Sequence, residues 1–129
     1  MKKKSKKIIQ IAMLLFLVSL LTINCKKDTT PTPTPASMIG TWTDASSGGK
    51  LIITSTKFTI YGSGLNLDEN TYTISSSNIT LKTTSSLFCT VNTTCSYTFT
   101  VTSTKLSFTK VTDACYQRNA YMNVTYTRQ

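Results

Sequence analysis

Residues 71–83 read TYTISSSNITLKT, and this stretch determines the class of fold. In its first half a tyrosine and an isoleucine alternate with polar residues, and in its second half an isoleucine and a leucine do the same. A period of two is typical of a half-buried β-strand. The three serines between the halves supply turn chemistry. The stretch therefore predicts an antiparallel hairpin with one hydrophobic face and one polar face.

The same alternation recurs along the chain from residue 39. It predicts eight strands, at residues 39–43, 50–54, 57–61, 71–75, 78–83, 96–102, 105–110 and 122–128. Threonine fills most of the polar positions, where its β-branched side chain favours strand while facing water. The hydrophobic positions form the expected core: Trp42, Leu51 or Ile53, Phe58, Ile60, Tyr72, Ile74, Ile79, Leu81, Tyr97, Phe99, Val101, Leu106, Phe108, Val124 and Tyr126.

The connections between these strands are short, and no helix-length crossover separates any two of them. This favours an all-β fold, a single antiparallel up-and-down barrel, because closure removes exposed strand edges. A two-sheet β-sandwich is the alternative. The segment 67–70 is expected to be a turn. A helix of one or two turns is expected at residues 112–118, with Asp113 as its cap.

Residues 1–24 have the plan of a secretory signal. A cationic head, MKKKSKK, precedes an apolar stretch of about 16 residues, slightly short for a bilayer span. The stretch ends in LTINC, which resembles the lipobox at which bacterial lipoproteins are diacylated on cysteine and cleaved just before it. Thr22 and Asn24 stand where a consensus lipobox has leucine and a small residue. The resemblance implies a lipoprotein signal peptide and a palmitate-bearing Cys25. An uncleaved anchor at residues 8–24 and cleavage elsewhere are the alternatives.

Residues 25–37 are expected to be a tether. Cys25 is followed by KKDTTPTPTPAS, which contains no large apolar residue, and its alternating prolines favour an extended, semi-rigid spacer. The two lysines do not look like the aspartate-type signal that retains lipoproteins in the inner membrane. Lipid anchoring in the outer membrane of a Gram-negative bacterium is therefore expected, with the periplasmic and cell-surface sides both open. Residues 38–129 are expected to form one domain.

The net charge of +9 suggests a nucleic-acid partner at first. Five of the lysines, however, lie in the signal, where they orient the segment in the inner membrane. From residue 38 onward, seven basic and four acidic residues leave a net charge of only +3, without a basic cluster. Nucleic acid is therefore not an expected partner.

The two ends of the domain resemble those of a known group of proteins. Gly40 and Trp42 form a G-x-W motif in the first predicted strand, and Arg128 lies near the end of the last one. This resembles the lipocalins and the wider calycin group, in which such a tryptophan packs under a basic residue from near the chain's end. The segment Asp113-x-Cys115-x-x-Arg118 also looks like the end of small bacterial lipocalin-like lipoproteins. The resemblance covers residues 38–129. It implies that Trp42 and Arg128 close the barrel through a cation–π contact.

The resemblance further implies a small hydrophobic ligand inside the barrel. Strands of roughly five to seven residues, however, enclose a shallow cup, and side chains alone can fill an eight-stranded interior. Two functions therefore stay open. In the first, a membrane-tethered barrel binds a small hydrophobic ligand. In the second, a filled barrel acts through its outer surface on an envelope protein partner, as an inhibitor, or as an envelope structural module.

Three cysteines remain once Cys25 is assigned to lipidation. Export favours oxidation, and the odd count leaves one thiol free or paired outside the chain. A disulfide between Cys89 and Cys95 is the first candidate, and Cys115 paired with either of them is the alternative. A three-cysteine metal site is not expected, because the chain has no histidine.

Catalysis and cofactors are not expected either. There is no histidine to act as a general base. The only glutamate of the domain, Glu69, adjoins Asp68 in a turn-like segment where successive side chains diverge. Asp44 and Asp113 have the context of turn or capping residues, and no base can be named that would activate Cys115. The sequence therefore predicts a protein that is not an enzyme.

Overall fold

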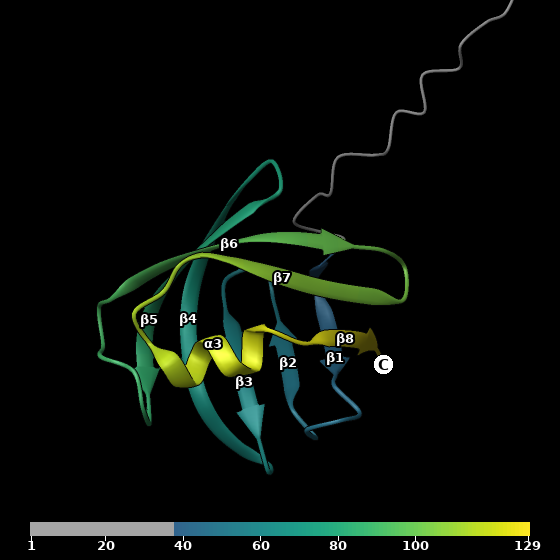
Figure 1. Ribbon diagram of the computed structural model, residues 1–129, viewed down its shortest axis with the longest axis horizontal. Helices are drawn as coiled ribbons and strands as arrows, with labels where there is room; N and C mark the ends of the chain where they lie inside the picture. The colour runs from purple at the N-terminus through teal and green to yellow at the C-terminus, as the bar shows by residue number, and fades with distance from the viewer. Residues whose placement is uncertain (1–37) are drawn as a thin grey trace, which may run out of the picture. The chain divides into compact units, whose positions relative to one another are not determined.

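The structure, a computed structural model, describes residues 38–129 (Figure 1). The predicted signal peptide, the tether and Cys25 lie outside these residues. Nine elements follow in chain order: β1 (Gly40–Thr43), β2 (Lys50–Ile53), β3 (Phe58–Gly62), β4 (Leu65–Ser75), β5 (Asn78–Ser86), β6 (Thr94–Val101), β7 (Lys105–Thr112), α3 (Tyr116–Met122) and β8 (Thr125–Arg128).

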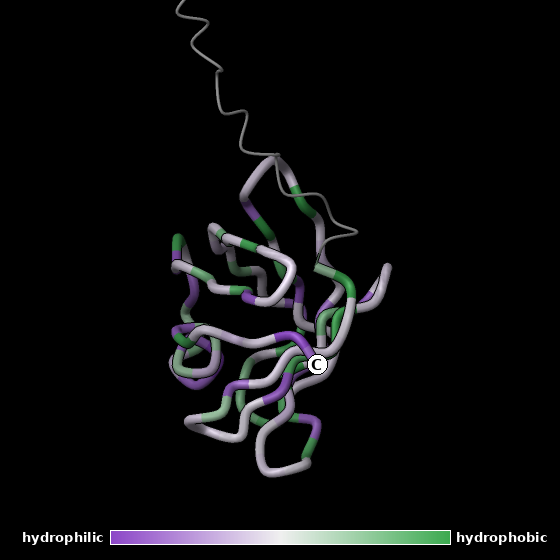
Figure 2. The backbone as a smooth tube through the Cα atoms, turned by 90° about the vertical axis from the view of Figure 1, so that its right-hand side faces the viewer, coloured by the Kyte–Doolittle hydropathy of each residue, from purple (hydrophilic) through white to green (hydrophobic). Residues whose placement is uncertain are grey.

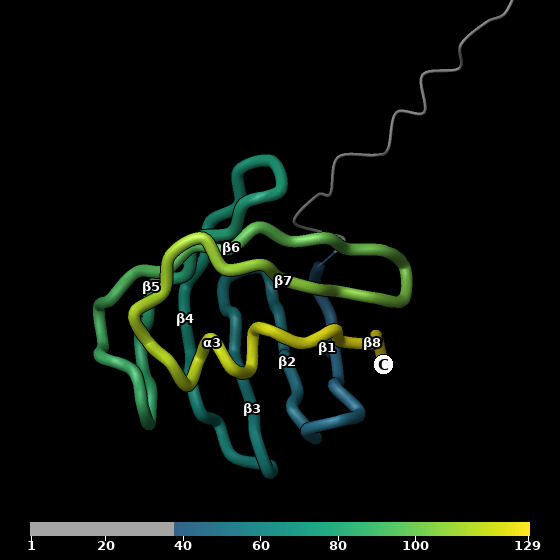
Figure 3. The backbone as a smooth tube through the Cα atoms, viewed as in Figure 1, coloured from purple at the N-terminus to yellow at the C-terminus, as the bar shows by residue number. Residues whose placement is uncertain are grey.

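The eight strands form a closed barrel in which every strand pairs antiparallel with its neighbours in sequence. Closure comes from β1 and β8, where Trp42 lies opposite Arg128 and Thr43 opposite Thr127. The predicted up-and-down barrel is confirmed, and the β-sandwich alternative is not observed. In Figure 3 the chain returns from β7 through α3 to β8, which ends beside β1.

The hairpin at residues 71–83 forms as predicted, with Tyr72 opposite Leu81 and Ile74 opposite Ile79. Short hydrophobic segments alternate with polar ones along the backbone tube (Figure 2). The predicted inward residues are buried, apart from four that are partly buried and packed against the core: Tyr72, Ile74, Val101 and Val124. Both Leu51 and Ile53 are buried, and the core gains Met38, Cys95 and Met122.

The turn predicted at residues 67–70 is wrong, because β4 already begins at Leu65. In this part of β4, Asp68 and Asn70 are completely buried, whereas the intervening Glu69 forms an ion pair with Lys57 at the surface. A register shift between Glu69 and Asn70 marks a bulge in the pairing with β5. Polar residues thus take the inward positions of a strand, and this hides the hydrophobic alternation.

The helix predicted at residues 112–118 is real but begins later, since α3 starts at Tyr116. Asp113 does not cap it: Asp113 Oδ1 accepts the backbone N–H of Cys115 at 2.8 Å, and the N-cap position belongs to Cys115. Residue 122, predicted to open the last strand, ends the helix instead. Arg118 and Met122 lie four residues apart on one helical face, and both are buried.

Because the strands run up and down, their connections fall alternately at two ends of the barrel. The tryptophan end holds the turns at residues 54–57, 76–77 and 102–104, together with Met38. The helix end holds the connections at residues 44–49, 63–64, 87–93 and 113–124, the last of which contains α3. Tyr121 of α3 stacks on the Phe88 ring with centroids 6.3 Å apart, and its hydroxyl closely approaches Gly62. α3 therefore packs against two other connections at this end of the barrel.

Candidate functional site

The predicted closure residues meet at the tryptophan end. The Arg128 guanidinium lies over the ring of Trp42, with Cζ 4.1 Å from the ring centroid. Arg128 Nη1 also donates a hydrogen bond to the Ile39 carbonyl at 3.0 Å, and Trp42 Nε1 donates one to the Met38 carbonyl at 2.8 Å. Trp42 is completely buried. The predicted contact between Trp42 and Arg128 is thus present, and it lies where β1 pairs with β8 to close the barrel.

Gly40 is required for this closure. Its φ of +145° favours glycine, and a Cβ at this position would lie 2.9 Å from Arg128 Nη1. We expect Gly40→Ala to lower the free energy of unfolding by about 1 to 3 kcal/mol, because the strained backbone and the displaced guanidinium both oppose folding. Urea unfolding followed by the fluorescence of Trp42, the sole tryptophan, measures the change. Gly48→Ala is the control, since φ is also positive there but a Cβ would meet no atom within 4 Å. An equal loss in both variants would contradict a role for the Arg128 contact.

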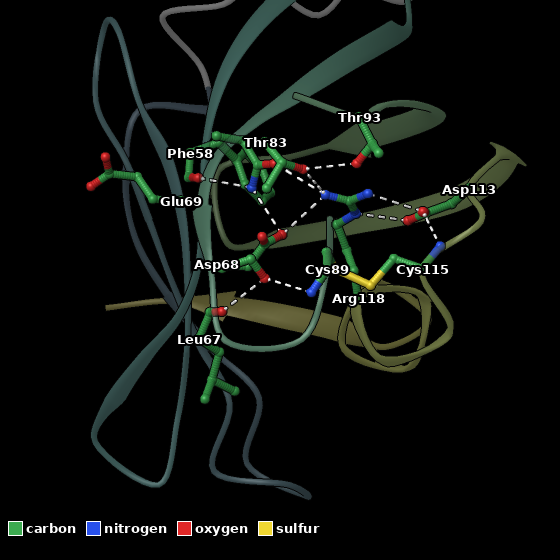
Figure 4. Close-up of polar contacts among 12 residues, drawn as sticks. Phe58, Leu67, Asp68, Glu69, Thr83, Cys89, Thr93, Asp113, Cys115 and Arg118 are labelled. Atoms are coloured by element: carbon green, nitrogen blue, oxygen red, sulfur yellow. Dashed lines mark hydrogen bonds and ion pairs between the residues drawn. A yellow bond between two sulfur atoms is a disulfide. The ribbon is translucent and has the colours of Figure 1, made fainter. Parts of the chain in front are cut away.

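A buried guanidinium organises the helix end. Arg118 is 1% exposed and reaches from α3 between Asp113 on one side and the barrel strands on the other (Figure 4). Its Nε donates to Asp113 Oδ2 at 2.8 Å and its Nη2 to Asp113 Oδ1 at 3.0 Å, which gives a bidentate ion pair. Its Nη1 donates into the barrel, to Asp68 Oδ2 at 3.2 Å, Asn70 Oδ1 at 3.1 Å and Thr83 Oγ1 at 2.7 Å.

These contacts set the charge state of the network. Burial alone would raise the pKa of Asp113, but hydrogen bonds from Arg118, the Tyr97 hydroxyl and the Cys115 N–H lower that pKa below its usual value. Burial would lower the pKa of Arg118, but the hydrogen bond to Asp113 and the nearby carboxylates raise it. Asp113 and Arg118 are therefore both charged at neutral pH. Asp68 Oδ1 is buried without a hydrogen-bond partner among residues 38–129.

The disulfide joins Cys89 to Cys115, with Cα atoms 5.6 Å apart. The first predicted pairing, Cys89 with Cys95, is wrong, and the alternative that included Cys115 is confirmed for Cys89. Cys95 is a free thiol on β6, opposite Leu81, and its side chain is buried in the core. Burial raises its pKa to about 12, so the thiol is protonated at neutral pH. Cys95 has the same parity as Tyr97 and Phe99, but the predicted strand began one residue too late to include it, whereas Cys89 lies in the loop before β6.

Two pockets lie at the helix end. The first, which we call the disulfide pocket, has a volume of about 220 Å³ and lies between residues 88–94 and residues 113–118. The second has about 270 Å³ and is lined by Ser47, Ala120, Tyr121 and Val124. The three bulkiest aromatic side chains of the core, Trp42, Tyr97 and Tyr126, line neither pocket.

Of the six large hydrophobic side chains that are exposed within residues 38–129, five lie in or beside the connections of this end, and Ile39 lies at the other end. Leu65 is 61% exposed, Leu87 70% and Tyr116 81%, and all three lie in or beside the connections of the helix end. Val91 and Val111 are exposed as well. The Cys89–Cys115 bond holds the loop that carries Leu87 and Val91 beside the segment that leads to Tyr116. These side chains come from separate connections, so no single stretch of sequence predicts this surface.

The connection between β1 and β2 is built around Asp44, as its predicted turn context suggested. The Asp44 carboxylate accepts hydrogen bonds from the backbone N–H groups of Ser46 and Ser47, both at 3.0 Å, and from both serine hydroxyls. The Ser47 hydroxyl, then the Ser46 N–H and hydroxyl, lower the pKa of Asp44 to about 2. The carboxylate form of Asp44 therefore stabilises the folded turn.

This gives a prediction for pH. A depressed folded-state pKa contributes stability that is present above the unfolded pKa near 3.8 and is lost as the pH falls through about 2. We expect Asp44→Asn to be less stable than the wild type at pH 7, and we expect the difference to shrink below about pH 3.8 until most of it is lost at about pH 2. Urea unfolding of both proteins between pH 7 and pH 2 measures the difference. A difference that does not depend on pH would contradict the assigned charge interaction.

Compared with protein-family models, curated proteins and solved structures, the chain matches none. Within residues 38–129, no group of three or more histidine, cysteine, aspartate or glutamate side chains could hold a metal ion. In the same part of the chain, no helix is both long and apolar enough to span a membrane.

Proposed function

We propose that the protein is a lipid-tethered, lipocalin-like barrel of the bacterial envelope that acts through its outer surface. The filled interior is the observation that carries this proposal. Fifteen buried hydrophobic residues form one cluster inside the barrel, and five further side chains pack against it. The Phe108 ring makes edge-to-face contacts with the rings of Phe58 and Tyr97, at centroid distances of 5.7 and 6.3 Å. Side chains thus take the volume that a ligand would need.

Access to the interior also favours this function over ligand binding. At the helix end, α3 inserts Arg118 and Met122, and Arg118 contacts side chains of both β4 and β5. A ligand that entered here would have to separate buried charges from their partners, which costs several kcal/mol. At the tryptophan end Trp42 is completely buried, with the Arg128 guanidinium over its ring. The barrel is therefore a rigid support for its connections.

The helix end is the proposed binding surface. Exposed hydrophobic side chains at one end of a small domain are candidates for an interaction site. Leu87, Val91 and Tyr116 lie on the two segments joined by the disulfide, so they are presented on a fixed frame. The partner would be an envelope component, which the protein would bind, inhibit or hold in place.

Attachment at Cys25 supports this role, since a semi-rigid tether at residues 25–37 would hold the barrel away from the membrane. Metabolic labelling with an alkyne analogue of palmitate tests this part of the proposal. The wild-type chain is expected to be labelled and to fractionate with the outer membrane. Cys25→Ala is expected to lose the label. Equal labelling of both chains would refute lipidation at Cys25.

Native mass spectrometry of the purified full chain tests the filled interior. The mass under native conditions is expected to equal the mass under denaturing conditions, because covalent lipid persists in both and a bound ligand persists only in the first. A hydrophobic molecule retained at one copy per chain would contradict the proposal and favour ligand binding.

Site-specific photo-cross-linking in the native envelope tests the binding surface. A photoreactive amino acid at position 91 or 116 is expected to give a defined cross-linked product. The control is position 103, in the exposed β6–β7 turn at the tryptophan end. The same product from position 103, or no product from positions 91 and 116, would rule out the helix end.

A further inference from the structure

The disulfide pocket lies between two segments of the chain that a covalent bond holds together. Residues 88–94 and residues 113–118 form its walls, and the Cys89–Cys115 bond joins them. The Phe88 ring on one wall is held by its stack on Tyr121, with an interplanar angle of 4°. Drug-sized ligands take pockets of about 300 to 1,000 Å³, so a pocket of about 220 Å³ suits a compact molecule the size of a single sugar ring.

The charged groups of this pocket are already neutralised. Asp113 and Arg118 both line it, but they are paired with each other through two hydrogen bonds, and their side chains are 0% and 1% exposed. Asp113 also accepts the Tyr97 hydroxyl and the Cys115 N–H. An anionic or cationic ligand would have to compete with this pairing. The pocket therefore favours a neutral ligand.

The remaining polar groups are neutral and available. Thr90, Thr94 and Gln117 line the pocket, and within residues 38–129 the side chain of none of the three has a hydrogen-bond partner. The two hydroxyls and the amide both donate and accept, which matches a ligand rich in hydroxyl groups.

An exposed aromatic ring completes the lining. Tyr116 is 81% exposed, and its ring has no aromatic or cationic partner in the described part of the chain. The C–H face of a pyranose packs on such a ring, while its hydroxyls reach neutral donors and acceptors. Aromatic surface beside neutral hydrogen-bonding groups is thus complementary to a sugar.

We propose that the disulfide pocket binds one neutral pyranose residue of an envelope or surface glycan. Tyr116 packs on the sugar face, and Gln117 with Thr90 and Thr94 binds its hydroxyls. This inference rests on the proposed function, since it names the class of ligand that the helix end takes. A peptide also offers neutral polar groups, and the experiment separates the two.

The experiment uses the full lipidated chain in a detergent without a sugar headgroup. Saturation-transfer NMR measures binding of glucose and N-acetylglucosamine, with glucuronic acid and a neutral Ser-Gly-Asn peptide as comparisons. Binding of a neutral sugar is expected, with weaker binding of glucuronic acid because Arg118 is already paired. No binding of either neutral sugar would overturn the inference, as would equal or tighter binding of glucuronic acid or of the peptide.

Variants locate the site. Gln117→Ala and Tyr116→Ala are each expected to weaken sugar binding by about tenfold, the effect of one hydrogen bond or one ring contact. Tyr116→Phe keeps the ring and is expected to retain most of the binding. Gln129→Ala, an exposed glutamine at the chain end, is the matched control. Trp42 fluorescence confirms that each variant is folded. Binding that is unchanged in Gln117→Ala and Tyr116→Ala would place the sugar elsewhere and refute the site.

Failure of this inference is distinguishable from failure of the proposed function. If no sugar binds while positions 91 and 116 still cross-link to a partner, only the ligand class is wrong. If native mass spectrometry reveals a hydrophobic ligand in the barrel, the proposed function itself is wrong.

Discussion

Replacement of Arg118 by leucine is expected to lower the free energy of unfolding by about 3 to 5 kcal/mol. The physical reason is that the guanidinium forms ion pairs with two carboxylates. Asp68 is completely buried, and the Asp113 side chain is 0% exposed, so both would remain in the protein without a positive partner. Urea unfolding followed by Trp42 fluorescence measures the loss, because this side chain passes from complete burial to water when the barrel opens.

Two further variants separate charge from geometry. Arg118→Lys keeps the positive charge but cannot reproduce the five hydrogen bonds that the guanidinium makes to Asp113 and the barrel together, so an intermediate loss is expected. Asp113→Asn in the Arg118→Leu background removes one buried carboxylate that has lost its positive partner, and it is expected to recover part of the stability. A loss below about 1 kcal/mol for Arg118→Leu is what an exposed ion pair gives, and it would show that Arg118 is not a buried partner of these carboxylates.

Removal of the disulfide is the second large expected effect. The Cys89–Cys115 bond closes a loop of 26 residues, for which the chain-entropy relation gives about 3.5 kcal/mol. The double variant Cys89→Ser/Cys115→Ser is expected to lose stability by this amount, because its unfolded chain regains the freedom that the bond removes. Cys95→Ala is the control. It leaves the disulfide intact and is expected to cost only about 1 kcal/mol through lost packing.

Peptide mapping of the wild-type chain without reduction tests the pairing directly. Trypsin cuts after Lys82 and Lys105 and after Lys110 and Arg118, so a bond between Cys89 and Cys115 joins the peptides 83–105 and 111–118. An alkylating label added after unfolding is expected on Cys95. Peptides that separate without reduction would indicate the Cys89–Cys95 pairing, and a label on Cys89 would indicate that Cys95 and Cys115 are joined.

Much of the fold follows from local pattern. Wherever a strand has hydrophobic residues on one face, as in the hairpin at residues 71–83, the period of two specified both the strand and its buried side. The meeting of Trp42 and Arg128 followed from the resemblance of the chain ends, and no count of residues would have given it. The prediction failed where the inward residues are polar. Asp68 and Asn70 have the composition of a turn, and their inward position becomes stable only because Arg118 lies opposite them.

The candidate site could not be predicted either, because its members are far apart in the sequence. Arg118 is 50 residues from Asp68 and 35 from Thr83, and the cysteine that binds Cys89 is the more distant of the two candidates. The disulfide pocket draws its lining from two connections that have no common motif. Asp113 and Arg118 were noted within a family pattern, but the pattern does not say which side chains they meet.

The sequence alone determined the strand count, the antiparallel order and which hydrophobic side chains face inward, because alternation is a local property that each strand carries by itself. Only the tertiary structure decided the partners of Arg118, the pairing of Cys89 with Cys115 and the composition of the helix end. These three features depend on barrel closure, which brings connections that are far apart in the chain to one end. A charged group can then be buried only where a neighbour pairs with it, and local sequence does not specify that neighbour.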